Sequence, residues 1–147
     1  HIHQVIKGCL RSVEQAAKEG GIHLTADIPE GLPTFDADLR SVHQIVLNLL
    51  SNAVKFTNYA GRIELTAEAL DHLMIIKVKD TGVGIPPESL EDITKPFAQS
   101  HSDPHMTQEG TGLGLSIVAS LVAAHDGTLD IQSEIDQGTT VTVSFPL

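Results

Sequence analysis

The chain has 147 residues, 41% of them hydrophobic and 3% aromatic, and a formal net charge of −10. This length fits one domain with an aliphatic core, and the acidic balance argues against nucleic acid and anionic membranes as partners, because both are bound through clustered Lys and Arg. The chain has one cysteine, no apolar run of roughly 18 residues and no signal-peptide pattern. These features favour a cytoplasmic domain, and any membrane anchor is expected on another part of a longer protein.

The first third of the chain predicts two helices with a strand between them. Apolar residues at helical spacing indicate a helix over residues 2–18, which the glycines of "EGG" end. Residues 22–28 alternate as a short strand. Asp36 or Asp38 caps the second helix, whose apolar stripe runs over residues 39–53.

The rest of the chain predicts four strands, a long loop and a third helix. Alternating residues indicate strands over 62–70 and 72–80. Residues 97–111 are mostly polar or small and predict a long flexible loop, which in a compact domain is usually functional. A helix over 113–124 and a closing hairpin over 127–147 follow.

These three helices and about five or six strands predict an α/β fold of the α+β kind. Its architecture is a two-layer sandwich, with a sheet that carries helices on one face. No internal repeat or linker divides the sequence, so a single domain is expected over residues 1–147.

The stretch "EGTGLGLSIV", residues 109–118, places three glycines, Gly110, Gly112 and Gly114, directly before the third helix. Such a turn can bring backbone N–H groups close to a phosphate, and the helix N-terminus adds partial positive charge. A merely tight turn explains the glycines about equally well. The P-loop and dinucleotide-binding patterns do not fit this spacing.

A second glycine motif, "DTGVGIPP", begins at Asp80, where an apolar strand ends. Residues 81–89 are predicted as a loop, with Gly82 and Gly84 giving it conformational freedom. A carboxylate only accepts hydrogen bonds, so it suits the adenine amino group and would repel the O6 atom of guanine. The alternative is an ordinary Asp-Thr-Gly turn.

The second helix carries a polar face beside its apolar stripe. Gln44, Asn48, Asn52 and Lys55 recur at helical spacing and therefore lie on one side of the helix. Asn is a poor residue for a helix interior, its amide oxygen can ligate Mg²⁺, and Lys55 supplies charge for a phosphate. A solvated helix face is the alternative.

The order of these motifs is more specific than any one of them. An Asn/Asn/Lys helix, D-x-G-x-G, a Pro-Phe pair, G-T-G-L-G-L and a final "GTTVTVSFP" hairpin follow one another. The whole chain resembles the catalytic and ATP-binding domain of bacterial two-component sensor histidine kinases, in the superfamily shared with gyrase, heat-shock chaperones and mismatch-repair ATPases. The resemblance implies a mixed sheet packed under three helices, with ATP held between the helices and a flexible lid at about residues 97–111.

The resemblance also implies a role for each motif residue. Asn52 would hold Mg²⁺ with support from Asn48, Lys55 would contact phosphate, and Asp80 would accept from the adenine amino group. The glycines before the third helix would wrap the triphosphate. The implied ATP-binding residues are Asn48, Asn52, Lys55, Phe56, Asp80, Gly82, Gly84, Ile85, Phe97, Gly110, Thr111, Gly112, Leu113, Gly114 and Thr140.

Some positions depart from the family pattern. "TKPF" has Thr94 in place of the first Phe of F-x-P-F, and Met106 and Thr107 stand where many members carry an Arg or Lys. ATP-hydrolysing relatives place a Glu one turn before the metal-binding Asn, and here that residue is Asn48. An amide cannot take a proton from water at neutral pH, which favours transfer to a protein acceptor over hydrolysis.

None of the eight histidines lies in the sequence context of a phosphoacceptor, so the expected acceptor is a histidine of a separate dimerisation helix domain. The implied function is a protein-histidine kinase that transfers the γ-phosphoryl of Mg-ATP, in a homodimeric parent that acts on a response regulator. The isolated fragment is expected to bind ATP without autophosphorylation. The alternatives are a pseudokinase-like module, in which ATP is a conformational ligand, and a stand-alone ATPase.

Overall fold

The computed structural model describes residues 1–90 and 114–147. In this part of the chain five strands form one mixed sheet in the order β1-β2-β3-β5-β4. Strands β1 and β2 pair in parallel, and the other neighbours pair antiparallel. The strands are β1 (His23–Asp27), β2 (Arg62–Leu70), β3 (Leu73–Asp80), β4 (Thr128–Glu134) and β5 (Gly138–Pro146).

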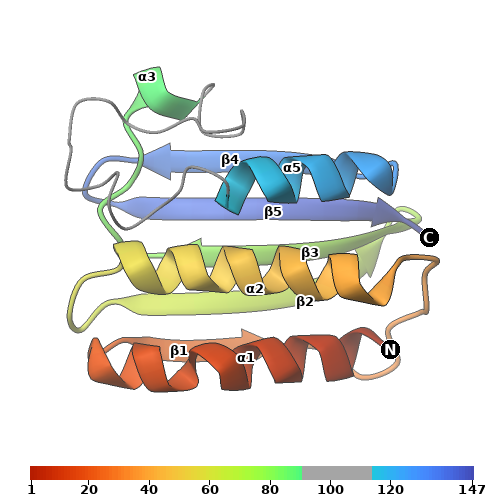
Figure 1. Cartoon of the computed structure of the whole chain (residues 1–147), viewed down its shortest axis with the longest axis horizontal. Coiled ribbons are helices and arrows are strands. Elements are labelled where there is room, and N and C mark those ends of the chain that lie inside the picture. The colour runs from red at the N-terminus through yellow and green to blue at the C-terminus, as the bar shows by residue number, and fades with distance from the viewer. Residues whose placement is uncertain (91–113) are drawn as a thin grey trace.

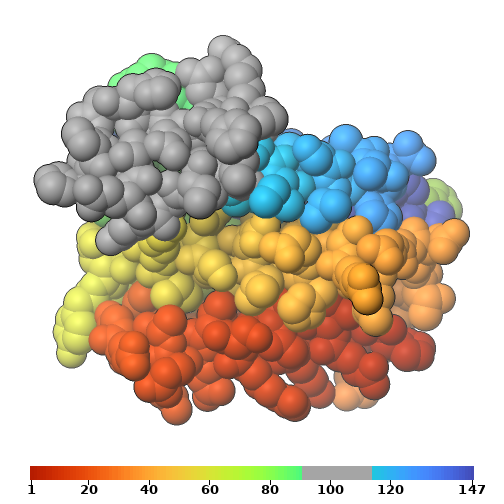
Figure 2. Space-filling view, viewed as in Figure 1, coloured from red at the N-terminus to blue at the C-terminus, as the bar shows by residue number. Residues whose placement is uncertain are grey.

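Three long helices lie side by side on one face of this sheet (Figures 1 and 2). Helix α2 lies between the other two and packs against both. Helices α2 and α5 run in opposite directions, so that the N-terminal end of each lies beside the C-terminal end of the other. The helices are α1 (Ile2–Glu19), α2 (Leu39–Phe56), a short α3 (Pro87–Leu90) and α5 (Gly114–Ala124).

The core lies between the helices and the sheet and is aliphatic. Ile6 and Cys9 of α1 and Ile45 and Leu50 of α2 are fully buried there. The Cys9 thiol donates to the backbone oxygen of His43, and burial raises the pKa of this thiol to about 11. The helical spacing of these residues therefore buries one stripe of each helix, as the sequence predicts.

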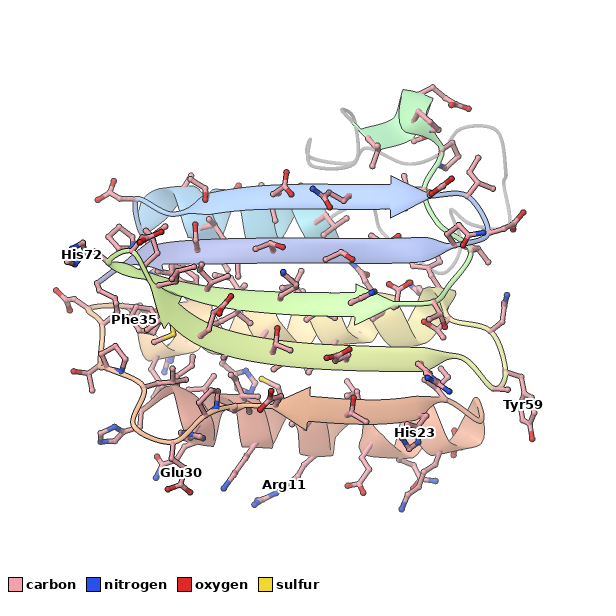
Figure 3. All side chains as sticks on the ribbon, turned by 180° about the vertical axis from the view of Figure 1, so that it is seen from behind. Arg11, His23, Glu30, Phe35, Tyr59 and His72 are labelled. Carbon is pink, nitrogen blue, oxygen red and sulfur yellow. The ribbon has the colours of Figure 1, made fainter. Side chains whose placement is uncertain are left out.

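The strands alternate between the core and the open face of the sheet. In β3, Met74, Ile76 and Val78 are buried, whereas Lys77 and Lys79 are exposed. Figure 3 shows the sheet from behind, where no helix covers the described strands. The predicted two-layer α/β architecture is thus confirmed, with five strands in the sheet.

The structure refines two sequence expectations. Asp38, rather than Asp36, caps α2, and its carboxylate accepts from the backbone N–H and the hydroxyl of Ser41 at 2.9 and 2.7 Å. The region predicted as a loop over 81–89 contains the start of α3, because the Pro87 ring has the backbone angle that a first helical turn needs.

Within residues 1–90 and 114–147, no helix has the length and apolar character needed to cross a membrane.

Candidate nucleotide-binding site

Asp80 is the last residue of β3, and its side chain lies on the helix side of the sheet. It is 9% exposed, and burial raises the pKa of its carboxyl group above the ordinary value. Its Oδ1 atom accepts hydrogen bonds from the backbone N–H groups of Gly82 at 2.8 Å and Thr139 at 3.2 Å. These bonds oppose the effect of burial on the pKa, and they fix the carboxylate in one orientation.

The loop after Asp80 is held tightly against the end of α2. The Val83 N–H donates to the Phe56 carbonyl at 3.1 Å. A Cβ atom on Gly82 would lie 2.2 Å from that same oxygen, so no other residue fits there without displacing the loop. The D-x-G-x-G motif is therefore anchored one helical turn beyond Asn52.

The other side of this loop is held by the turn between β4 and β5. Gly84 has φ +77, and a Cβ atom there would lie 2.2 Å from the Glu134 carbonyl oxygen. The N–H of Ile85 donates to the Ser133 hydroxyl at 2.7 Å, and the N–H of Asp136 donates to the Val83 carbonyl at 2.9 Å. Both glycines of the motif are thus required by close backbone contacts.

The polar face of α2 meets the start of α5. Gln44 donates to the Asn48 Oδ1 atom at 2.8 Å, and the Asn48 side-chain amide donates to the Gly114 carbonyl at 3.5 Å. Asn52 lies next to the same glycine, because a Cβ atom on Gly114 would be 3.3 Å from its Nδ2 and 3.4 Å from its Oδ1 atom. The structure therefore brings the Asn motif and the last glycine of "GTGLG" together.

Lys55 and Phe56 end the polar face of α2. The Lys55 ammonium lies 5.9 Å from the centre of the Phe56 ring, within the range of a cation–π contact. Lys55 is exposed and Phe56 is partly buried. Together with the loop contacts described above, this places Asn48, Asn52, Phe56, Asp80 and Gly114 around one end of the helix layer.

Thr140 does not lie beside Asp80. The register of β3 and β5 places Asp80 opposite Thr139, and Thr140 opposite the exposed Lys79. Opposite residues of an antiparallel pair share a face, so Thr140 points to the open face of the sheet. The backbone N–H of Thr139, not of Thr140, donates to the Asp80 carboxylate. The ATP-binding role that the resemblance implies for Thr140 stays a prediction.

Other predicted residues lie outside the described part of the chain. They are Phe97, Gly110, Thr111, Gly112 and Leu113, together with the lid at about 97–111 and the altered positions Thr94, Met106 and Thr107.

Sequence reasoning missed Ser133 as a site residue. Its hydroxyl accepts from the Ile85 N–H and makes further hydrogen bonds with the Gly138 carbonyl at 3.0 Å and the Thr139 hydroxyl at 2.8 Å. A serine on a strand does not stand out in a sequence, so only the register of β4 with β5 reveals these three hydrogen bonds. Ser133 connects the glycine loop to the residue that holds Asp80.

The residues of this site lie in a region that matches a known protein family. The sequence profile described as histidine kinase-, DNA gyrase B-, and HSP90-like ATPase (HATPase_c) matches residues 37–147, a range that includes every site residue named above. The chain belongs to this family. The resemblance inferred from the order of the motifs is thereby confirmed.

Two curated relatives from Caulobacter vibrioides match nearly the whole chain. The "Non-motile and phage-resistance protein" is 42% identical over 151 residues, covering 100% of this chain and 18% of the relative. "Histidine protein kinase DivJ" is 40% identical over 144 residues, covering 98% of this HATPase_c chain and 24% of the relative. The chain thus spans about a quarter or less of the length of these relatives.

Solved structures show the same architecture. Full-length ShkA in complex with AMPPNP is 35% identical, with a TM-score of 0.85 over 99% of this chain and 30% of that protein. The nucleotide-free catalytic domain of histidine kinase ThkA is 26% identical, with a TM-score of 0.84 over 98% of this chain and 91% of that domain. The HATPase_c fold therefore includes α1 and β1, which precede the matched profile.

Proposed function

We propose that this HATPase_c domain binds Mg-ATP and donates the γ-phosphoryl group to a histidine on a separate dimerisation helix domain of a two-component sensor kinase. The observation that supports this most is the fixed carboxylate of Asp80. Two backbone N–H groups hold its Oδ1 atom, and no hydrogen bond from the described residues occupies Oδ2. Oδ2 can therefore accept from the amino group of adenine.

The metal-binding role belongs to Asn52. Its amide lies beside Gly114, and no hydrogen bond from the described residues occupies it. The described residues include no cluster of His, Cys, Asp and Glu that could hold a metal by itself. This fits Mg²⁺, which takes oxygen ligands and is commonly bound through one or two protein groups together with substrate phosphates. Asn52 would supply the protein oxygen and the nucleotide the phosphate oxygens.

Asn48 favours phosphoryl transfer to a protein over hydrolysis. Its Oδ1 atom accepts from Gln44 and its Nδ2 atom donates toward Gly114, so the amide is engaged at both ends. An amide in this arrangement has no basic site to take a proton from water. The names of relatives such as "Histidine protein kinase DivJ" support the same conclusion for the longer protein.

In that longer protein the partners are the phosphoacceptor helix domain and, through the phosphorylated histidine, a response regulator. A homodimeric parent would bring the acceptor helices to the nucleotide. Catalysis by this domain is then mainly the positioning of the γ-phosphate and the stabilisation of its charge, to which Lys55, Mg²⁺ and backbone N–H groups contribute.

Removal of the Asn52 amide tests the metal site. Asn52→Ala should leave the adenine contact at Asp80 intact, and it should abolish the tightening of ATP binding that Mg²⁺ gives the wild type. The measurement is titration calorimetry with ATP, in Mg²⁺ and in chelator, for both proteins.

The matched control is Asn58→Ala, since Asn58 is an exposed asparagine beyond the end of α2. This variant should show the full effect of Mg²⁺. If Asn52→Ala also keeps the full effect, Asn52 is only a structural residue of the helix, and another group holds the metal.

A further inference from the structure

His125 follows the last residue of α5 and joins this helix to the start of α2. Its Nδ1 atom lies 2.7 Å from the Leu121 carbonyl oxygen, and its Nε2 atom accepts from the Asp38 backbone N–H at 3.1 Å. Leu121 belongs to α5, and Asp38 is the N-cap of α2. One imidazole ring therefore links the C-terminal end of α5 to the N-terminal end of α2.

The imidazole ring of His125 also packs against an aromatic side chain. It meets Phe145 edge-on, with ring centres 6.1 Å apart, and Phe145 stacks on Phe35 at 5.3 Å. Phe145 is 1% exposed, and His125 is partly buried. Phe35 lies toward the same end of the sheet as His72 (Figure 3). The contact with Phe145 and the two hydrogen bonds together leave the imidazole little freedom to turn.

The contacts fix the protonation of this ring. The Leu121 carbonyl can only accept, so Nδ1 must carry a hydrogen, and the Asp38 N–H can only donate, so Nε2 must be unprotonated. The Asp38 carboxylate makes its hydrogen bonds to the N–H and hydroxyl of Ser41, and the ring is bonded to the Asp38 backbone N–H. The structure thus requires a neutral imidazole with its hydrogen on Nδ1.

The position of α5 along α2 decides where the nucleotide site forms. The buried residues of α5 are Ser116, Val118 and Val122. The hydrophobic effect is non-directional, whereas a hydrogen bond fixes the distance between two particular atoms. Polar contacts between α2 and α5 are present at both ends of α5, from Asn48 to Gly114 and from His125 to Asp38.

We propose that His125 is a positioning residue of the nucleotide site, which fixes α5 lengthwise so that Gly114 stays beside Asn48 and Asn52. It acts about 16 Å away, because 11 residues separate it from Gly114 and a helix rises 1.5 Å per residue. This inference rests on the proposed nucleotide site and adds a residue that does not touch the nucleotide.

The test compares two substitutions of His125. His125→Phe keeps an aromatic ring against Phe145 but removes both hydrogen bonds. His125→Gln restores an acceptor near the position of Nε2. We expect His125→Phe to shift the side-chain amide NMR signals of Asn48 and Asn52 and to weaken Mg-ADP binding by about three- to tenfold. This is the size expected if binding must repay the one neutral hydrogen bond that joins α5 to α2. His125→Gln should recover most of both.

Val122→Ala is the control for a purely structural effect. It removes buried volume from the same helix, since Val122 is 1% exposed, without removing either hydrogen bond of His125. It should lower the melting temperature and leave Mg-ADP affinity within about twofold of the wild type. If His125→Phe, measured where it is folded, behaves like Val122→Ala, His125 is a stability residue and the proposal is wrong.

A measurement on the unmodified protein keeps the proposal testable if His125→Phe does not fold. Two-bond ¹H–¹⁵N NMR spectra should show His125 neutral with its hydrogen on Nδ1, and His125→Gln identifies the signal among the eight histidines. An Nε2-protonated ring would overturn the proposal. A wild type that fails to bind Mg-ADP would contradict the proposed function instead, while the Asn48 and Asn52 signals still test the positioning.

Discussion

At the scale of single residues, the proposed adenine-binding role of Asp80 conflicts with the stability of the fold. The fold buries its carboxylate beneath the helix layer, and burial raises its pKa even though two N–H groups stabilise the charge. A charged group with a raised pKa lowers the stability of the folded state above that pKa. A buried carboxylate of this kind is expected where a ligand, rather than the fold, requires it.

Asp80→Asn should therefore stabilise the domain near neutral pH. The asparagine Oδ1 atom can still accept from Gly82 and Thr139, and no charge is buried. The pKa of Asp80 in the folded state lies above the ordinary value of 3.8. The free energy of unfolding of the wild type therefore falls as the pH rises from about 3.8 through this raised pKa, and the stability advantage of the variant grows over the same pH range. Urea unfolding at about pH 7 and about pH 3 measures this difference.

The control is Asp130→Asn on β4, where the carboxylate is exposed to solvent. It should change the free energy of unfolding little at either pH. An Asp80→Asn variant that is less stable than the wild type at neutral pH would show that the carboxylate contributes more to the fold than its burial costs.

At the scale of elements, the glycine loop after β3 depends on its contact with the β4–β5 turn. Gly84→Ala should place a methyl group against the Glu134 carbonyl, in addition to the strain of an L-residue at φ +77. We expect a loss of more than about 2 kcal/mol in the free energy of unfolding, or a displaced loop with weakened nucleotide binding. Chemical denaturation and calorimetry measure the two effects.

Gly31→Ala separates strain from collision. Gly31 has φ +78, almost the same as Gly84, but a Cβ atom there meets nothing within 4 Å. This variant should lose only about 1–2 kcal/mol, the cost of the left-handed backbone, and bind nucleotide normally. If the two variants lose the same free energy of unfolding, the close contact with the Glu134 carbonyl adds nothing to the cost of Gly84→Ala.

The sequence predicts periodic features well and register poorly. The apolar stripes of α1 and α2 and the alternation in β3 reflect local spacing, so helices and strands were predicted close to their observed bounds. Asp80 and Asn52 belong to short motifs that can be recognised from the sequence alone. Thr139, Ser133 and His125 contribute through partners in other elements, and these partners depend on strand register and helix packing that residue spacing does not reveal.

At the scale of the whole molecule, one end of the helix layer gathers residues from across the chain. Asn48 and Asn52 come from α2, Asp80 from the end of β3 and Gly114 from the start of α5, and the β4–β5 turn closes the loop beside them. The rest of the helix layer and the sheet form the packed support that keeps these groups in register. A site on packed helices and strands is well suited to hold a nucleotide in one orientation.

Titration calorimetry with Mg-ADP and Mg-GDP tests the adenine site at Asp80 most directly. The domain should bind Mg-ADP and discriminate strongly against Mg-GDP, because guanine presents an acceptor where adenine presents a donor. Asp80→Asn, which remains folded by the reasoning above, should lose about 1–3 kcal/mol of Mg-ADP binding, because it opposes a donor to a donor. Equal affinity for the two nucleotides, or unchanged Mg-ADP binding by Asp80→Asn, would contradict the assignment of Asp80 as the residue that recognises adenine.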